Sequence, residues 1–201
     1  MNFLAHLYLS GNDEQLMIGN FIADSVKGSY YEKFPEGIKK GILLHRAIDF
    51  FSDNHPVFLK SVERLRPNYR KYSGVIVDIF YDHFLAKDWK SYSENPLEQF
   101  AEEVHLLMMR NIFHMPEKSL MFLKYAMRTN RLVSYANVDG IGEVLYGMSR
   151  RTKFKSNMEF AAKDLKENYS EFENEFRIFF EEARGFVAEW RKANFPNQSF
   201  L

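Results

Sequence analysis

A chain of 201 residues with 46% hydrophobic residues is long enough for one sizeable domain with one core. Its 27 basic and 27 acidic side chains give a formal net charge of zero, which excludes a global field that would attract nucleic acid or an anionic membrane. Cysteine is absent, which excludes disulfides and thiolate zinc sites and fits a reducing, cytoplasmic location. With no long apolar run and no basic leader, we expect a soluble protein without a signal peptide or a membrane-spanning helix.

The first apolar segments of the chain each contain one polar residue that can bind a metal. His6 interrupts the apolar residues 3–9, and Asp24 interrupts the apolar run 18–26. A lone histidine among apolar residues is usually a hydrogen-bonded core group, and a lone aspartate often caps or ends a helix. Taken singly, each residue therefore has an ordinary structural explanation.

The segment GILLHRAIDFF, residues 41–51, predicts a helix with two polar groups on its apolar face. His45 and Asp49 are four residues apart and therefore lie one above the other. They continue an apolar stripe that begins with Ile38 and Ile42. The pair alone fits either a structural hydrogen bond or the start of a ligand set.

A second helix with the same property is predicted by GVIVDIFYDHFLA, residues 74–86. Asp78 and Asp82 are again four residues apart on an apolar face, and His83 follows directly. A buried carboxylate without a partner costs several kcal/mol or more, so inward-facing aspartates need partners. His83 is turned about 100° around the helix from Asp82, which favours Asp78 over His83 as a further ligand.

The remaining elements are also predicted to be helical. We expect all six prolines to lie where helices begin or stop rather than inside them, and Asn95-Pro96 to open a well-formed helix. Strand patterns are weak, and repeats and linkers are absent from the sequence. The fold class predicted is all-α, a single-domain helical bundle over residues 1–201.

The last part of the chain predicts a long helix with a narrow aromatic seam, because apolar residues recur at alternating steps of four and three. This seam favours packing across the domain's own helices, and the alternative is a weak homodimer through the same face. The seam residues are Leu165, Tyr169, Phe172, Phe176, Phe179, Ala183, Phe186 and Trp190.

Several inward-facing histidines and aspartates in one small protein favour a metal site. Histidine supplies a neutral nitrogen and aspartate a hard anionic oxygen, a combination that suits Mn²⁺, Mg²⁺, Zn²⁺ or Fe²⁺. Helical bundles often build such sites from pairs on one helix face. The alternative left open by these residues is a set of satisfied polar groups in the core.

The order of the motifs resembles the acyl carrier protein phosphodiesterase family, also called acyl carrier protein hydrolases. The resemblance covers the chain through about residue 155, with GMSRR its weakest part. The segments that carry it are MNFLAHLYLS at the start, GNFIADSVKG at 19–28, GILLHRAIDFFSDNHP at 41–56, VIVDIFYDHFLAKDW up to Trp89, and GMSRR at 147–151.

The resemblance implies a reaction and a cofactor. Family members remove 4′-phosphopantetheine from holo acyl carrier protein with a divalent cation, typically Mn²⁺, and the family is a distant relative of the helical HD-type metal phosphohydrolases. Such an enzyme would serve lipid metabolism around fatty acid biosynthesis, attacking the phosphodiester with metal-activated water. The metal-ligand candidates carried over by motif are His6, Asp24, His45, Asp49, Asp78 and Asp82.

The roles within this set are assigned as hypotheses. We expect His45, Asp49 and Asp82 to be ligands first and His6 and Asp24 next. Asp24 is the first candidate for acid–base catalysis, and His83 is a second catalytic candidate because an imidazole beside the metal could move a proton. The pair at 82–83 runs Asp-His rather than His-Asp, so the ligand order of ordinary HD proteins does not transfer.

Carrier proteins are acidic around their modified serine, so a neutral enzyme must concentrate positive charge locally to bind them. The substrate-binding candidates are Lys27, Arg46, Arg150 and Arg151, with ordinary solvated surface charges as the alternative. Two other functions compete with the carrier-protein reaction. One is a metal phosphohydrolase of a nucleotide or another small phosphoester, and the other is a non-catalytic helical interaction protein.

Overall fold

The computed structural model describes residues 3–195, and within this range the chain is helical with no strand, which confirms the all-α prediction. The α-helices are α1 (Phe3–Leu9), α2 (Glu14–Ile22), α3 (Glu36–Asn54), α4 (Pro56–Tyr69), α5 (Ser73–Lys87), α6 (Leu97–Arg110), α7 (Glu117–Arg128), α8 (Arg131–Ser134), α9 (Val138–Ser149), α10 (Ala161–Glu167) and α11 (Tyr169–Asn194). Short 3-10 helices are η1 (Ala23–Ser25), η2 (Gly28–Lys33), η3 (Arg70–Tyr72), η4 (Trp89–Ser91), η5 (Ile112–His114) and η6 (Met158–Phe160).

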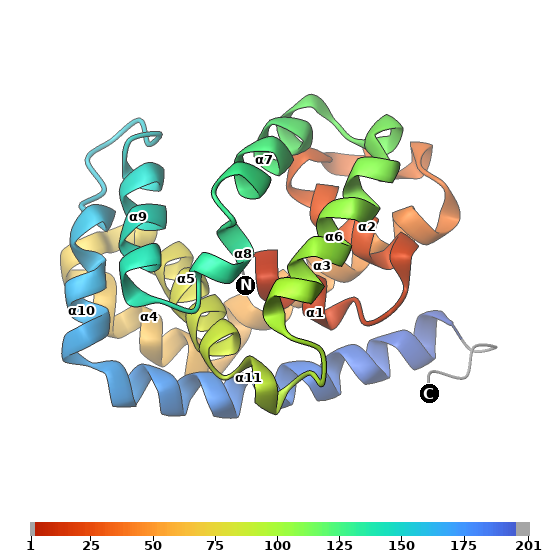
Figure 1. Cartoon of the computed structure of the whole chain (residues 1–201). Coiled ribbons are helices and arrows are strands. Elements are labelled where there is room, and N and C mark those ends of the chain that lie inside the picture. Colours follow the sequence, from red (N-terminus) through yellow and green to blue (C-terminus); the bar gives the residue numbers. More distant parts are fainter. Residues whose placement is uncertain (1–2, 196–201) are drawn as a thin grey trace.

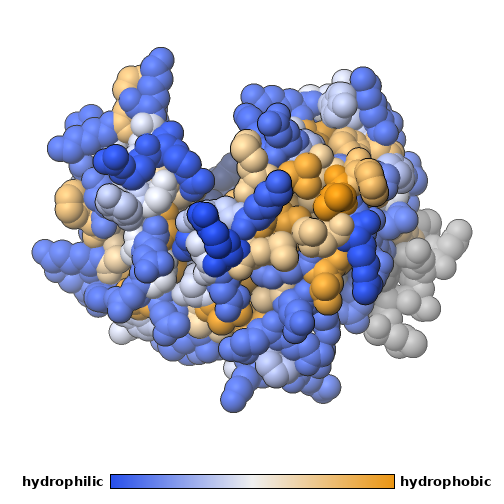
Figure 2. Space-filling model, turned by 45° about the horizontal axis from the view of Figure 1, so that its top comes forward, coloured by the Kyte–Doolittle hydropathy of each residue, from blue (hydrophilic) through white to orange (hydrophobic). Residues whose placement is uncertain are grey.

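The helices form two arms above a long basal helix (Figure 1). One arm contains α9 and α10, the other contains α2, α6 and α7, and the short α8 lies between them. Helix α11 runs beneath both arms and packs against α3, α4 and α5. The face between the arms is hollowed, and apolar side chains gather on the arm with α6 and α7 (Figure 2).

Helix α5 lies at the centre of the molecule. Almost every residue from Ile76 to Ala86 is buried, including Asp82 and His83, because α5 packs against α1, α4, α9 and α11. A helix that is apolar around its whole circumference is expected to be a core helix. Any polar side chain on α5 must therefore find its partner inside the protein.

Helices α2 and α3 approach more closely than any side chain would allow. A Cβ built on Gly19 would lie 2.1 Å from the carbonyl oxygen of Ile38 and 2.8 Å from Cα of Gly41. A Cβ on Gly41 would lie 2.3 Å from the carbonyl oxygen of Leu16. Since only hydrogen fits at this crossing, the two glycines set how deeply the α2 side chains reach toward α3.

Two predictions about helix boundaries need correction. Pro67 lies inside α4, contrary to the expectation that all prolines flank helices. It is in the last turn, where the helix is about to end at Tyr69, so few backbone hydrogen bonds are affected. The predicted C-terminal helix is interrupted at Asn168, which separates α10 from α11. Most of its aromatic seam is buried within the chain, as expected for packing across the domain's own helices.

Among the described residues, no helix combines the length and the apolar character that crossing a membrane requires.

Candidate metal centre

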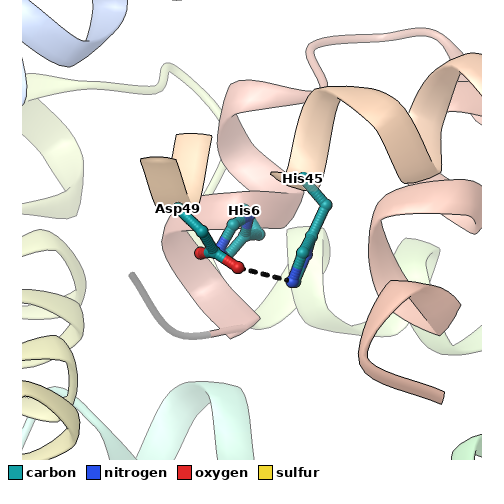
Figure 3. A group of neighbouring side chains, drawn as sticks. All are labelled: His6, His45 and Asp49. Carbon is teal, nitrogen blue, oxygen red and sulfur yellow. Dashed lines mark hydrogen bonds and ion pairs between the residues drawn. The ribbon is translucent and has the colours of Figure 1, made fainter. Parts of the chain in front are cut away.

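Three side chains from two helices meet in one compact cluster (Figure 3). Nε2 of His6, on α1, lies 3.1 Å from Oδ1 of Asp49, and Nε2 of His45 lies 3.1 Å from Oδ2 of the same carboxylate. The two imidazole rings stack with their centroids 4.0 Å apart. One potential ligand atom from each residue lies within 4.8 Å of the others, so a single ion could reach all three.

The helical repeat explains why His45 and Asp49 lie together. His45 and Asp49 lie on consecutive turns of α3 and present both groups to the same side. His6 comes from a separate helix and is 3% exposed, while the Asp49 side chain is 41% exposed. The cluster is therefore buried behind its imidazoles and open to solvent at its carboxylate.

A buried amide supports the cluster from behind. Asn20, on α2, is 1% exposed, and its Oδ1 lies 2.9 Å from Nδ1 of His45. Its Nδ2 donates to the carbonyl oxygen of His6 at 2.9 Å and to Oγ of Ser10 at 3.0 Å. Asn20 was not among the predicted site residues, although it interrupts the same apolar run 18–26 as Asp24.

Asp24 lies at the mouth of the cluster. It belongs to η1, directly after α2, and its Oδ1 is 3.4 Å from Nε2 of His45. Its side chain is 68% exposed, so both water and a large substrate can reach it. The hydrogen bond from His45 holds the pKa of Asp24 below its ordinary value, which keeps this carboxyl ionised at neutral pH.

The charges within the cluster shift the pKa values in opposite directions. Burial lowers the pKa of His45, but hydrogen bonds to Asp24 and Asp49 outweigh it and raise the pKa to about 9. Burial, helped by the charge of His45, lowers the pKa of His6 to about 4. Burial raises the pKa of Asp49, yet hydrogen bonds from both histidines bring it well below its usual range. The protonated ring of His45 therefore lies between the carboxylates of Asp24 and Asp49. A metal cation would be favoured at the same place.

Asp82, on α5, holds the backbone of α1. It is completely buried, and its two oxygens accept hydrogen bonds from the backbone N–H groups of Leu4 at 2.9 Å and Ala5 at 3.0 Å. Burial raises the pKa of Asp82 to about 7, although these bonds favour the charged form. Asp82 therefore caps the first turn of the helix that carries His6, and its expected role as a ligand stays a prediction.

Asp78 lies one turn before Asp82 and is not among the three residues of the cluster. Burial raises its pKa, and the neighbouring charges of Asp49 and Asp53 add to this effect. The role of Asp78 as a further ligand stays a prediction.

His83 is not among the three residues of the cluster, and its expected catalytic role stays a prediction. Its Nδ1 lies 2.8 Å from the carbonyl oxygen of Tyr135, and its Nε2 lies 2.8 Å from the hydroxyl of Tyr169. The turn of about 100° between neighbouring helical residues directs Asp82 toward α1 and His83 toward a different part of the core.

The predicted substrate-binding residues occupy different positions. Arg46 donates through Nη2 to the carbonyl oxygens of Val26 and Gly28, both at 2.9 Å, and so fixes the loop that follows Asp24. Its expected role in substrate binding stays a prediction. Lys27 is exposed in that loop. Arg150 and Arg151 are exposed after α9, on the other arm of the molecule.

Two cavities differ sharply in size and lining. A cavity of about 10 Å³ borders the cluster and is close to the space that one water-sized sphere needs. Its lining includes His6, Asn20, Asp24 and His45. A second cavity, of about 880 Å³, lies beside α11, and none of these side chains lines it. The chemistry-bearing groups therefore gather at the smaller cavity.

Comparison with known proteins gives a consistent result. A family model described as acyl carrier protein phosphodiesterase matches residues 1–183. A protein of that name from Photorhabdus laumondii is 30% identical over 90% of this chain and 91% of its own length. Relatives with the same name from Enterobacter sp. and Escherichia coli O6:H1 are 32% and 33% identical, over 90% of this chain and 94% of theirs. No solved structure matches, so the expected likeness to HD-type phosphohydrolases stays a prediction.

Proposed function

The chain belongs to the acyl carrier protein phosphodiesterase family, and on this premise we propose that it releases 4′-phosphopantetheine from holo acyl carrier protein. The bond that breaks joins phosphorus to the serine oxygen of the carrier protein. Water supplies the new oxygen on phosphorus, and the serine oxygen takes up a proton. The products are the apo carrier protein and 4′-phosphopantetheine. The proposal places this reaction in the cytoplasm.

The observation that carries the proposal is the carboxylate of Asp49 between the Nε2 atoms of His6 and His45, at 3.1 Å from each. This donor set suits a divalent cation, with Mn²⁺ first and Mg²⁺, Zn²⁺ or Fe²⁺ as alternatives. When bound, such a cation offsets the negative charge of the phosphodiester and lowers the pKa of water. His6, His45 and Asp49 would hold it, with Asp24 or Asp78 completing the set.

The remaining groups act on the water and on the substrate. Asp24 is ionised, exposed and adjacent to His45, so it is the residue best placed to accept a proton from the attacking water. Arg46 holds the loop after Asp24 through its bonds to Val26 and Gly28, which limits where this carboxylate can move. Lys27, Arg150 and Arg151 are exposed cations available to the acidic surface of a carrier protein.

The decisive experiment is intact-mass spectrometry of holo acyl carrier protein incubated with the protein and Mn²⁺, with and without a chelator. We expect conversion to the apo mass that the chelator stops. Asp49→Asn should lower the rate at least 100-fold together with Mn²⁺ affinity, because it removes the carboxylate between the two histidines. Asp24→Asn should lower the rate about 10²-fold to 10⁴-fold while Mn²⁺ binding changes less.

Asp139→Asn is the matched control, since it removes a carboxylate whose side chain is 96% exposed on α9. Its rate should equal that of the unmodified protein. Retained Mn²⁺ binding with no conversion of any carrier protein would favour a small phosphoester as substrate. Neither conversion nor Mn²⁺ binding would contradict the enzymatic proposal.

A further inference from the structure

Asn20 ties together the three helices on which the candidate metal centre is built. It lies on α2, its Oδ1 faces Nδ1 of His45 on α3 at 2.9 Å, and its Nδ2 donates to the carbonyl oxygen of His6 on α1 at 2.9 Å. Asn20, His6 and His45 are each less than 10% exposed. Solvent therefore cannot readily replace these hydrogen bonds, and each polar atom must be satisfied by its neighbours.

The orientation of the Asn20 amide follows from its surroundings. The carbonyl oxygen of His6 can only accept hydrogen bonds, so the amide atom facing it is the NH₂ group. The hydroxyl of Ser10 donates to the same carbonyl at 2.9 Å and so offers a lone pair to the other hydrogen of Nδ2. Both donors of Asn20 are therefore committed, and Oδ1 is left as an acceptor toward His45.

An acceptor at 2.9 Å requires a hydrogen on Nδ1 of His45. In a neutral imidazole, the other nitrogen then carries the lone pair. That nitrogen, Nε2, is the atom that lies 3.1 Å from Asp49 and 3.4 Å from Asp24. The side of the ring that faces the solvent-open end of the cluster is thus the side that can bind a cation.

We propose that Asn20 is a positioning residue that fixes the Nδ1–H tautomer of His45 and so makes Nε2 the atom that binds the cation. This inference rests on the proposed cation site. The same amide also sets the distance between the two histidines, because it bonds to the backbone of one and to the ring of the other. Close approach of α2 to α3 at Gly19, the preceding residue, brings the amide within reach.

The direct test uses nitrogen NMR on the full chain with ¹⁵N-labelled histidine and Zn²⁺ as a diamagnetic probe. We expect a hydrogen-bonded proton on Nδ1 of His45, protected from exchange, and a metal-shifted Nε2. A proton on Nε2, with Nδ1 bound to the metal, would overturn the inference. This measurement requires no substitution, so a variant that fails to fold cannot obscure it.

Variants then test whether Asn20 is the cause. Asn20→Leu should lower Zn²⁺ affinity about 10-fold to 100-fold, measured by competition with a chelator, and expose the Nδ1 proton to exchange. Asn20→Asp keeps an oxygen opposite Nδ1 but loses both Nδ2 donors, so it should restore the protected proton without restoring the bond to the carbonyl oxygen of His6. Ser10→Ala is the matched control, because it removes a neighbouring hydrogen bond of the same network but leaves the contact between Asn20 and His45.

The outcomes separate the two proposals. If the unmodified protein binds Zn²⁺ but Asn20→Leu and Ser10→Ala weaken binding equally, the amide is a packing element and the inference fails alone. If Asn20→Leu leaves both the affinity and the Nδ1 proton unchanged, the inference also fails alone. If the unmodified protein binds neither Zn²⁺ nor Mn²⁺, the cation site itself is wrong and both proposals fall.

Discussion

Asp49 and Asp82 are both acidic residues on predicted apolar helix faces, but their partners give them different roles. Asp49 contacts two imidazoles and remains partly open to solvent. Asp82 is fully buried and contacts two backbone N–H groups at the start of α1. Beside Asp49, a cation could replace the proton of His45. Asp82 instead holds the first turn of α1 in place. A residue type and its spacing therefore do not settle whether a carboxylate is a ligand.

Asp82→Asn tests this difference in role. Asparagine offers one oxygen and presents an NH₂ group to the second backbone donor, so one buried N–H loses its acceptor. We expect a loss of about 2 kcal/mol in the free energy of unfolding, or roughly 4–8 °C in Tm, with a chelator present. Thermal unfolding measures this. Unchanged stability in chelator together with lost Mn²⁺ binding would instead make Asp82 a ligand.

The sequence predicted single residues well where the contact is local. The pair His45 and Asp49 follows from the helical repeat, and the structure brings it together as expected. The hydrogen bonds of Asp82 reach Leu4 and Ala5, which precede it in the sequence by 78 and 77 positions. No helical or strand periodicity predicts a contact over such a separation. His83 directly follows Asp82 but contacts Tyr135 and Tyr169, because neighbours in sequence point in different directions around a helix, and its catalytic role stays a prediction.

At the scale of elements, the crossing of α2 and α3 brings the residues of the candidate metal centre together. His45 and Asp49 lie on α3, while Asn20 lies on α2 directly after Gly19. Because a Cβ at either Gly19 or Gly41 would overlap the opposite backbone, the helices touch at this point. The motifs that contain these glycines therefore supply packing as well as ligands.

Gly41→Ala should destabilise the protein although alanine favours helices. The better helix propensity contributes about 1 kcal/mol, but a Cβ 2.3 Å from the carbonyl oxygen of Leu16 forces the helices apart. Overpacking of this kind costs about 1–3 kcal/mol, so we expect net destabilisation and weaker Mn²⁺ binding.

Gly185→Ala in α11 is the matched control, because nothing lies within 4 Å of its added Cβ. It should raise the free energy of unfolding by up to about 1 kcal/mol. Chemical denaturation measures both variants. A stabilised Gly41→Ala protein with normal Mn²⁺ affinity would show that the close crossing is not needed for the site.

Helix starts were the most predictable part of the elements. Pro35, Pro56 and Pro96 lie at the beginnings of α3, α4 and α6, as the sequence indicated. Helix ends were less predictable, because Pro67 is tolerated in the last turn of α4 and the C-terminal helix breaks at Asn168. The end of a helix depends on tertiary packing, whereas the start of a helix is marked by characteristic residues such as proline.

At the scale of the whole molecule, the cluster of His6, His45 and Asp49 couples folding to the binding of protons. His45 has a pKa of about 9 against an ordinary value of 6.5, because Asp24 and Asp49 stabilise its charged form. A group whose pKa is raised by folding adds stability that is fully present below the ordinary pKa and is lost as the pH rises through the folded value. Protonated His45 therefore stabilises the cation-free protein most below about pH 6.5 and least above about pH 9.

A divalent cation should reverse this pH dependence. In chelator, we expect the free energy of unfolding to fall between pH 6.5 and 9, by on the order of 3 kcal/mol from His45 alone. With Mn²⁺, binding requires neutral His45 and strengthens as protons leave, so the stabilisation that Mn²⁺ adds should grow over the same interval. His45→Gln should flatten both trends, because it removes the proton that the cation displaces. Denaturation at several pH values measures the slopes, and equal slopes with and without Mn²⁺ would mean that no cation competes for this proton.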